Sequence, residues 1–396
     1  MSIDSYDMKR ISTQRKLKIL ALQHRRDRRR RRHARVLKEL SLAHQRLSRK
    51  ISEYRSIFSQ SYGISLPKDE RRLPIMLPQV ISLRDNYDET VSAIAQLRNT
   101  TLINRLPAFV YFDRITHLEP AAALLLAAEI YRCRAIRSYR NGPIISGSYP
   151  KDIDVCLQLR DLGFFSLFEV ADLPDLEGVS SREDRPHFLK FVSAKAVIAE
   201  FASGLTDAVT RGAFQMNAKA KRRMVGALKE AMGNSVEHAY QGADPAHCMH
   251  GRWWLSAYID PAKREMMVIV LDQGVGIPRT LDPTWPERFA ALRSLTGFSP
   301  TDAHMIMAAT ELHRSSTGQS GRGKGFRDMK RFVDQCDDGE LLIVSNSGRY
   351  HYINGQEQIR DHLVSIEGTL IEWRVRHGAS VETQDDEEDE IDINSA

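Results

Sequence analysis

The chain has 396 residues, of which 42% are hydrophobic and 27% are charged. This is the composition of an ordinary folded protein, and it excludes a wholly disordered or fibrous chain. The longest uninterrupted apolar run, residues 121–128, is far shorter than the ~20 residues that a membrane-spanning helix needs. Since no apolar signal sequence is visible and the four cysteines lie far apart, we expect a cytoplasmic protein without a membrane partner.

The net charge of +6 is concentrated at the two ends of the chain. Residues 1–50 contain 17 lysines and arginines against four acidic residues, whereas residues 381–396 contain eight acidic residues and no basic ones. The remainder is nearly neutral. This distribution predicts a basic arm over residues 1–62 and an acidic tail over residues 377–396.

The basic arm is predicted to be helical, because apolar side chains recur every three or four residues between Val36 and Ile51. An arginine-rich run lies within it, formed by Arg25, Arg26, Arg28, Arg29, Arg30, Arg31 and Arg32. Such a run is typical of segments that bind nucleic acid or another polyanion. A solvated helix whose apolar stripe docks on the body or on a second copy explains the same pattern, so both interpretations stay open.

Residues 63–90 contain three prolines and are predicted to be a linker. Over residues 91–172, patterns typical of strands and helices alternate, which predicts a small α/β module. The expected elements are a strand at 109–113, a helix at 120–136, a strand at 144–147 and a helix at 153–162. A boundary at 171–187 and an amphipathic helix over 188–214 follow.

This module resembles a STAS domain, the fold of anti-sigma-factor antagonists. The resemblance rests on the strand that ends at Asp113, on the Ala/Leu-rich helix after it, and on the sequence Leu-Arg-Asp-Leu-Gly-Phe at 159–164. Such domains often carry a phosphorylatable serine before the first helix, where this chain offers only Thr116. The departure favours a packing or sensing module over a phosphorylated one.

The segment 228–240 carries Glu230, Asn234 and His238 four residues apart, so the three side chains share one face of a helix. An asparagine amide oxygen suits Mg²⁺, which prefers oxygen ligands. A glutamate can accept a proton from water on such an ion. An exposed polar helix face without a function would show the same spacing.

An apolar strand at 266–271 runs directly into Asp272, Gly274 and Gly276. Glycines allow the backbone to turn sharply and to approach a ligand closely. A carboxylate at the end of a strand can accept a hydrogen bond from an exocyclic amine such as that of adenine. A tight turn after a core strand is the simpler alternative.

A glycine-rich basic loop precedes a predicted helix at 327–333. Backbone N–H groups in such a loop can bind phosphate, although the loop lacks the Ser/Thr of a P-loop. Its candidate phosphate-binding residues are Gly321, Arg322, Gly323, Lys324 and Gly325. A last short motif, Glu-Gly-Thr ending at Thr369, leads into a predicted strand at 370–375.

In this order, the four motifs resemble the N box, the two glycine boxes and the final Gly-Thr box of the GHKL, or Bergerat-fold, ATPase superfamily of gyrases, Hsp-ninety chaperones and histidine kinases. The resemblance covers residues 188–376 and implies an α+β two-layer sandwich with strands at 253–259, 266–271, 340–345 and 370–375. The predicted class is therefore α/β: a basic helix, a STAS-like module and a Bergerat-type domain.

The resemblance also implies that the domain binds ATP and Mg²⁺. Asn234 would hold the metal ion, and Glu230 would be the catalytic general base. Asp272 would accept a hydrogen bond from the adenine amine, with Thr369 close to it. Gly274 and Gly276 would shape the adenine pocket, the loop at 321–325 would wrap the phosphates, and residues 279–320 would form the lid.

The pattern from Glu230 to His238 most resembles the anti-sigma-factor serine kinases. We therefore expect an ATPase or a serine/threonine-type protein kinase that acts as a nucleotide-dependent switch on a protein partner or within a homodimer. The alternative is a nucleic-acid-associated ATPase, such as an anti-phage or mobile-element protein, which uses the arginine-rich arm. A third possibility is a nucleotide-binding scaffold without turnover.

Overall fold

The computed structural model describes residues 4–63, 66, 72–137, 143–170, 185–212, 216–244, 249–281, 300–311 and 325–376. Contacts divide the chain into two units, Met1–Leu73 and Pro74–Ala396. In the described residues, no helix has both the length and the apolar character needed to cross a bilayer.

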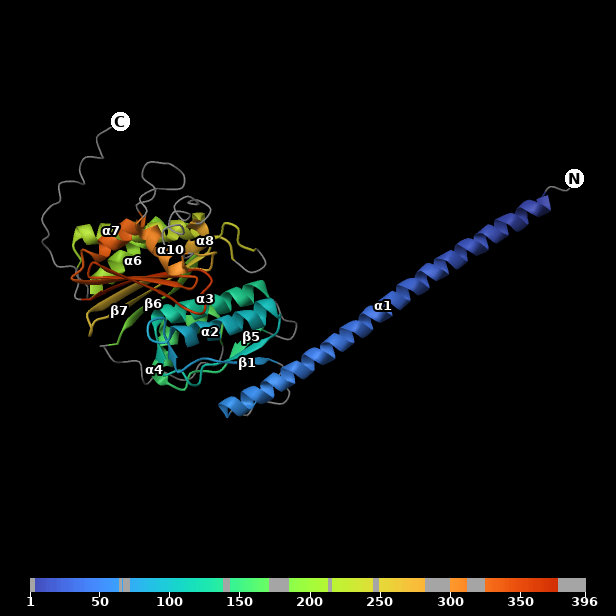
Figure 1. The fold of residues 1–396 in the computed structure, drawn as a ribbon, viewed down its shortest axis with the longest axis horizontal. Coiled ribbons are helices and arrows are strands. Elements are labelled where there is room, and N and C mark those ends of the chain that lie inside the picture. Colours follow the sequence, from blue (N-terminus) through green and yellow to red (C-terminus); the bar gives the residue numbers. More distant parts are fainter. Residues whose placement is uncertain are drawn as a thin grey trace, which may run out of the picture. The chain divides into compact units, whose positions relative to one another are not determined.

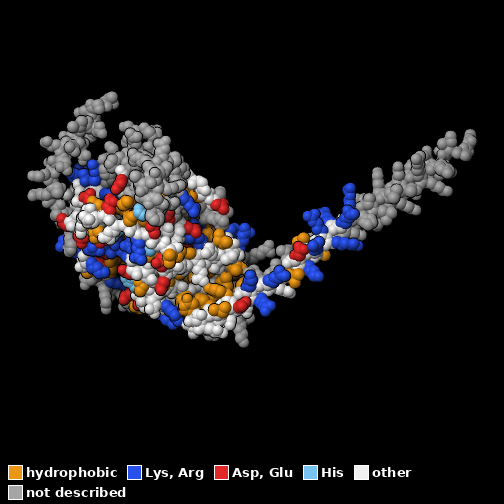
Figure 2. Space-filling view, in the orientation of Figure 1, with side chains coloured by type: hydrophobic (Ala, Val, Ile, Leu, Met, Phe, Trp, Pro, Cys, Tyr) orange, Lys and Arg blue, Asp and Glu red, His pale blue; other side chains and the backbone are white. Residues whose placement is uncertain are grey.

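Most of the described residues of the first unit form one long helix, α1 (Asp4–Tyr62). Its 59 residues correspond to about 90 Å of helix at 1.5 Å per residue. Figure 2 shows lysine and arginine side chains distributed along its described surface. After the helix, the chain is held by the Arg55 guanidinium, whose Nη1 donates a hydrogen bond to the carbonyl of Arg72 at 2.7 Å. The predicted basic helix is thus confirmed.

The second unit begins with two small sheets and the helices that pack on them. The larger sheet has the order β1-β3-β5, and the smaller one pairs β2 with β4 in parallel. The strands are β1 (Leu73–Met76), β2 (Val80–Ile81), β3 (Ala108–Tyr111), β4 (His117–Leu118) and β5 (Ile145–Gly147). The helices are α2 (Tyr87–Arg98), the π-helical η1 (Asn99–Ile103), α3 (Pro120–Ile136), α4 (Ile153–Asp161) and α5 (Phe164–Leu167). We call this part, up to residue 170, the N-terminal module.

Local sequence explains the bounds of the module's helices. Helix α3 starts at a proline, whose fixed φ suits the first helical turn. Helix α4 starts after Asp152, whose carboxylate accepts the backbone N–H groups of Asp154 and Val155 at 2.9 and 3.1 Å. Gly163 follows with a φ of +77°, a conformation that favours glycine. The predicted strand–helix alternation is confirmed.

The segment predicted as a linker, 63–90, differs from that expectation. Its described part forms β1, β2 and the start of α2. Ile75, Leu77, Ile81 and Leu83 are buried, and this spacing of two residues is typical of strands. Pro74 lies within β1 and Pro78 lies between β1 and β2, where few backbone N–H groups are needed, so these two prolines do not interrupt the fold.

The rest of the second unit is built on a seven-stranded antiparallel sheet of order β11-β10-β9-β12-β8-β7-β6. Its strands are β6 (His187–Ala194), β7 (Trp253–Asp260), β8 (Glu265–Asp272), β9 (Asp338–Ser345), β10 (Gly348–Ile353), β11 (Gln356–Asp361) and β12 (Thr369–Arg376). The helices are α6 (Ala199–Gly212), α7 (Ala218–Glu237), α8 (Ile277–Leu281), α10 (Asp302–Glu311) and α11 (Gly325–Val333). The four predicted strands are adjacent in the sheet, as β9, β12, β8 and β7.

The predicted helix over 188–214 is wrong in its first half. Residues 187–194 form the edge strand β6, which pairs with β7 and contains an irregularity between Leu189 and Val192. Only from Ala199 does the chain become helical. Phe188 and Val192 favour strands, and the pairing that decides their conformation comes from residues about 60 positions away, which a local pattern cannot reveal.

Both faces of the sheet are covered. Leu341, Ile343 and Trp373 pack on one face with helices α6, α7 and α11, whereas Leu342 and Leu370 pack on the other face with the N-terminal module. Figure 1 shows α2 and α3 on the side of the sheet opposite to α6 and α7. The mixed α/β class is confirmed, and the sheet is the middle layer of three.

Buried carboxylates of the sheet pair with an arginine of the module. Arg84, from the module, contacts Glu340 of β9 at 2.8 Å and Glu372 of β12 at 2.5 Å, and it lies 3.5 Å from Glu119. Burial alone would lower the pKa of Arg84, but the carboxylates of Glu372 and Glu340 outweigh it and raise that pKa. Arg84 therefore neutralises charges on both layers.

We expect the substitution Arg84→Ala to lower the free energy of unfolding by about 3 kcal/mol, because it removes the cation nearest to the buried Glu372 and leaves that carboxylate only Arg374, at 3.5 Å. The measurement is denaturant unfolding at neutral pH. The control Arg360→Ala removes an exposed arginine, and it should change stability by less than about 0.5 kcal/mol. Equal stability of the two variants would contradict a structural role for the Arg84 cluster.

Candidate functional site

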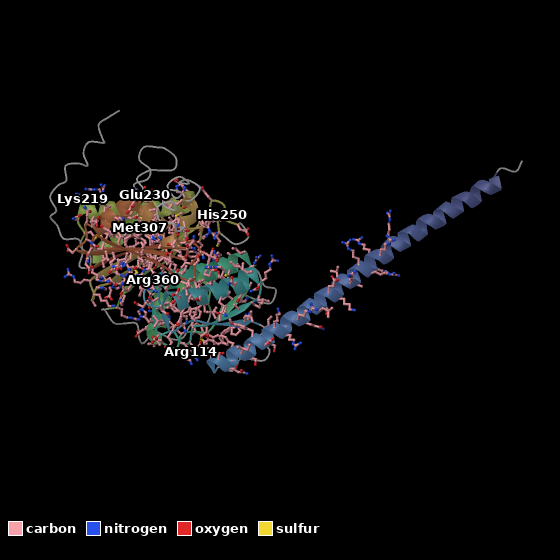
Figure 3. All side chains as sticks on the ribbon, in the orientation of Figure 1. Arg114, Lys219, Glu230, His250, Met307 and Arg360 are labelled. Carbon is pink, nitrogen blue, oxygen red and sulfur yellow. The ribbon has the colours of Figure 1, made fainter. Side chains whose placement is uncertain are left out.

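Three of the four sequence motifs meet where β8 ends and β12 begins. Asp272, the last residue of β8, is the register partner of Thr369, the first residue of β12. Helix α7, which carries the first motif, packs against β8. In Figure 3, Glu230 lies on the side of the sheet that carries α7. The candidate site is therefore on the face opposite to the N-terminal module.

Asp272 is the centre of this arrangement, and only 6% of its surface is exposed. One carboxylate oxygen, Oδ1, accepts the N–H of Gly274 at 2.9 Å, and the other, Oδ2, accepts the hydroxyl of Ser235 at 3.3 Å. Burial raises the pKa of Asp272 to about 6, against the lowering effect of these bonds and of the Thr369 N–H. A carboxylate offers about four acceptor positions, so this one can still accept an amine.

The loop after Asp272 is fixed by close packing of its backbone. The N–H of Val275 donates to the carbonyl of Ala239, just after α7, at 2.7 Å. A Cβ on Gly274 would lie 2.1 Å from that same carbonyl oxygen, so no larger residue fits. Gly276 has a φ of +84° and lies against the amide of Asn346, which donates to the Val275 carbonyl at 3.0 Å. These glycines are required by the fold itself, whether or not a ligand also approaches.

Thr369 lies on the other side of Asp272. Its hydroxyl shares a hydrogen bond of 2.9 Å with the hydroxyl of Ser345, the last residue of β9. Ser345 also accepts the N–H of Ile277 at 2.8 Å. The preceding Gly368 has a φ of +152°, and a Cβ there would lie 2.1 Å from the carbonyl oxygen of Asp272. The strand ends are thus in direct contact.

The sequence pattern did not identify Ser235, Ser345 and Asn346 as parts of the site. Ser235 directly follows Asn234, so its place in the first motif was the available signal. The other two residues lie at the end of β9, and only the strand register brings them to Asp272 and its loop.

The accessible face of α7 carries the two residues predicted for metal and proton chemistry. Glu230 is exposed and Asn234 is half-buried, whereas Leu228, Ala231 and Met232 pack into the core. The N–H groups of His238 and Ala239, which follow the helix, both donate to the backbone carbonyl of Asn234 at 3.0 Å. Asn234 and Glu230 are four positions apart in α7, so they lie one helical turn from each other.

Most of the predicted phosphate loop lies outside the described residues, namely Gly321, Arg322, Gly323 and Lys324. Gly325 begins α11, which packs against α7. Of the predicted lid, 279–320, the structure describes residues 279–281, which end α8, and residues 300–311, which include α10.

No group of three or more His, Cys, Asp or Glu in the described residues has a geometry that would hold a metal ion. Mg²⁺ bound between one asparagine and a triphosphate needs no such group. The Asn234 side-chain amide oxygen is a ligand of the type that Mg²⁺ takes.

Two further predicted features lie elsewhere. Thr116 is exposed, and both its backbone N–H and its hydroxyl donate to the carbonyl of Gln79. The arginine-rich run lies in α1, where the side chains of Arg25 and of residues 28–32 are exposed. Arg26 lies in the same helix, and its side chain is outside the described set.

No family model matches the chain, and no curated protein matches its sequence. The GHKL and STAS resemblances therefore remain predictions.

We expect the raised pKa of Asp272 to make stability depend on pH. Its ordinary pKa is 3.8 and its folded-state pKa is about 6, so the folded chain binds more protons between these values. The free energy of unfolding should therefore fall as the pH rises from about 4 to about 6, by up to about 3 kcal/mol.

The measurement is unfolding of the wild type and of Asp272→Asn at several pH values between 4 and 7. The difference between them should change across the lower part of this range and be constant above about pH 6.5. A difference that does not vary with pH would contradict the burial argument.

Proposed function

We propose that residues 188–376 bind MgATP in the manner of a GHKL ATPase or kinase, and that the chain is a cytoplasmic, nucleotide-dependent regulatory switch. One observation carries this proposal: the buried carboxylate of Asp272 bonds to Ser235 of the first motif, to Gly274 of the second and to Thr369 of the fourth. Motifs that are more than 130 residues apart in sequence thus converge on the group that would accept the adenine amine.

The roles of the residues on α7 follow from their positions. Bound Mg²⁺ would neutralise charge on the phosphates, and the Asn234 amide oxygen is the group that would hold it. Glu230 lies one turn away and is exposed, so it can orient an attacking water or the hydroxyl of a protein acceptor and take its proton. The loop at 321–325 would contribute backbone N–H groups to the phosphates.

The exposed position of Glu230 suits a reaction with a partner as well as hydrolysis. An acceptor serine or threonine must reach within about 3 Å of the general base. The resemblance of the first motif to that of anti-sigma-factor serine kinases supports a protein partner, and a second copy of this chain would satisfy the same requirement.

We expect Glu230→Ala to bind MgATP with an affinity close to that of the wild type but to lose turnover by about 10²–10⁴-fold. Asn234→Ala should lose the magnesium-dependent part of the affinity. Calorimetric titration of nucleotide with and without Mg²⁺, together with ADP release, measures both effects. Lys229→Ala changes an exposed neighbour on α7 and should match the wild type. Absence of ATP binding by the wild type would overturn the proposal.

A second candidate function, nucleic-acid binding, is favoured by the described surface of α1. Residues 28–32 are five successive arginines, and all are exposed. Because successive residues in a helix are rotated by about 100°, these side chains surround the helix and do not share one face. An apolar docking stripe needs a single face, so this segment is better suited to a polyanion than to packing on a protein.

We expect a variant with arginines 28–32 all changed to glutamine to bind duplex DNA more weakly than the wild type. Its salt dependence should also be shallower, with the slope of log K against log salt reduced by about 0.9 for each lost phosphate contact. Fluorescence anisotropy at several salt concentrations measures this. The matched control changes five exposed cations outside α1 to glutamine: Lys151, Lys195, Arg222, Lys229 and Arg264. Equal slopes for the two variants would contradict this function.

A further inference from the structure

Gln273 connects the candidate site to the opposite layer of the protein. It directly follows Asp272 and is only 4% exposed. Its backbone N–H donates to the hydroxyl of Tyr240 at 3.1 Å, and its side-chain amide donates to Glu129 Oε2 at 3.3 Å. Glu129 belongs to α3 of the N-terminal module. The residue next to the candidate adenine-binding carboxylate is therefore bonded to a helix on the far side of the sheet.

Glu129 also organises the other strand end at the site. It is completely buried and accepts hydrogen bonds from Arg98 at 3.1 Å and from Arg132 at 2.5 Å. Arg98 in turn donates to the carbonyl of Ile366 at 3.0 Å and pairs with Glu367 at 2.9 Å. These last two residues lead into Gly368 and Thr369. Glu129 is therefore connected directly to Gln273, which follows Asp272, and through Arg98 to residues 366–367, which lead to Thr369, the register partner of Asp272.

The charge on Glu129 is maintained by its partners. Burial alone would raise the pKa of Glu129, but the guanidinium groups of Arg132 and Arg98 outweigh burial and lower it. Movement of α3 would carry Arg132 along with Glu129 but would separate this carboxylate from the buried Arg98 and from Gln273, which is unfavourable because it leaves buried charged and polar groups without these partners. The cluster of Arg98, Glu129, Arg132, Glu367 and Gln273, which we call the Glu129 cluster, therefore resists displacement.

We propose that Glu129 is a positioning residue for the nucleotide site. Through Gln273 on one side and through Arg98 and Glu367 on the other, it fixes the orientation of the Asp272 carboxylate, and so sets the preference of the site for adenine. Glu129 itself touches neither the nucleotide nor the metal ion. This inference rests on the proposed function, and it assigns to the N-terminal module a direct part in nucleotide selection.

The test compares the affinities for MgATP and MgGTP, because a change in their ratio reports on the base-binding end of the site. Glu129→Gln keeps the shape of the side chain and removes its charge. We expect it to reduce the preference for ATP over GTP by roughly tenfold, which is within the range of coupling through residues that do not contact a ligand. Gln273→Ala leaves the arginine pairs of Glu129 intact, and we expect it to reduce the preference in the same direction.

The matched control is Glu340→Gln. Glu340 is also a buried carboxylate between the sheet and the module, but it pairs with Arg84 and with Arg376, at the far end of β12. Its substitution should lower the free energy of unfolding without changing the nucleotide preference. Denaturant unfolding of every variant ensures that only folded proteins are compared. If Glu129→Gln does not fold, the ratio of the ATP and GTP affinities of Gln273→Ala tests the inference.

The possible outcomes separate the two proposals. Wild-type protein that binds neither nucleotide overturns the proposed function and this inference together. Wild-type protein that prefers ATP, with the same preference retained in Glu129→Gln and Gln273→Ala, overturns the inference alone. An equal loss of preference in Glu340→Gln would also overturn it, since the effect would then arise from general destabilisation. A reduced preference for ATP in Glu129→Gln and Gln273→Ala, with the wild-type preference retained in Glu340→Gln, supports the positioning role of Glu129.

Discussion

Burial of the seven-stranded sheet on both faces is the constraint on which the rest of the second unit depends. An antiparallel sheet can leave one face in water, but here the central strands are apolar at successive positions and lie between two layers of helices. Charged side chains on the inner, module-facing surface must then be neutralised inside the protein. Arg84 and Glu129 each do this for a cluster that includes residues of both layers.

The same constraint explains the rigidity of the candidate site. Asp272 and Thr369 end and begin two central strands, so their relative positions are set by the ladder of the sheet. Close backbone packing at Gly274 and Gly368 leaves the chain no alternative path. The carboxylate of Asp272 accepts hydrogen bonds from α7, from the loop after β8 and from β12, so its orientation is fixed in advance for the ligand that we propose. Such preorganisation lowers the cost of binding.

The sequence predicted local features more successfully than distant ones. Helix α3 and strands β7, β8, β9 and β12 have strong internal patterns, and the structure contains them. The edge strand β6 was predicted as helix, because its conformation is decided by pairing with β7. Asp272 was recognisable from its position after an apolar strand, whereas Ser345 and Glu129 were not, since only register and layer packing bring them near it. Contacts between the module and the sheet cannot be recognised from the spacing of residues along the chain.

The arrangement of the two charge clusters has a consequence for any switch built on this fold. A conformational change passes from one layer of a protein to another only through contacts that join the parts that move. Most of the contact between the module and the sheet is apolar packing. The Glu129 cluster contacts the two segments beside Asp272, namely Gln273 and Glu367. The Arg84 cluster instead contacts Glu372 and Glu340, and Glu340 pairs with Arg376 at the opposite end of β12. A displacement of α3 would therefore act on the candidate site first, and a displacement near Arg84 would act mainly on stability.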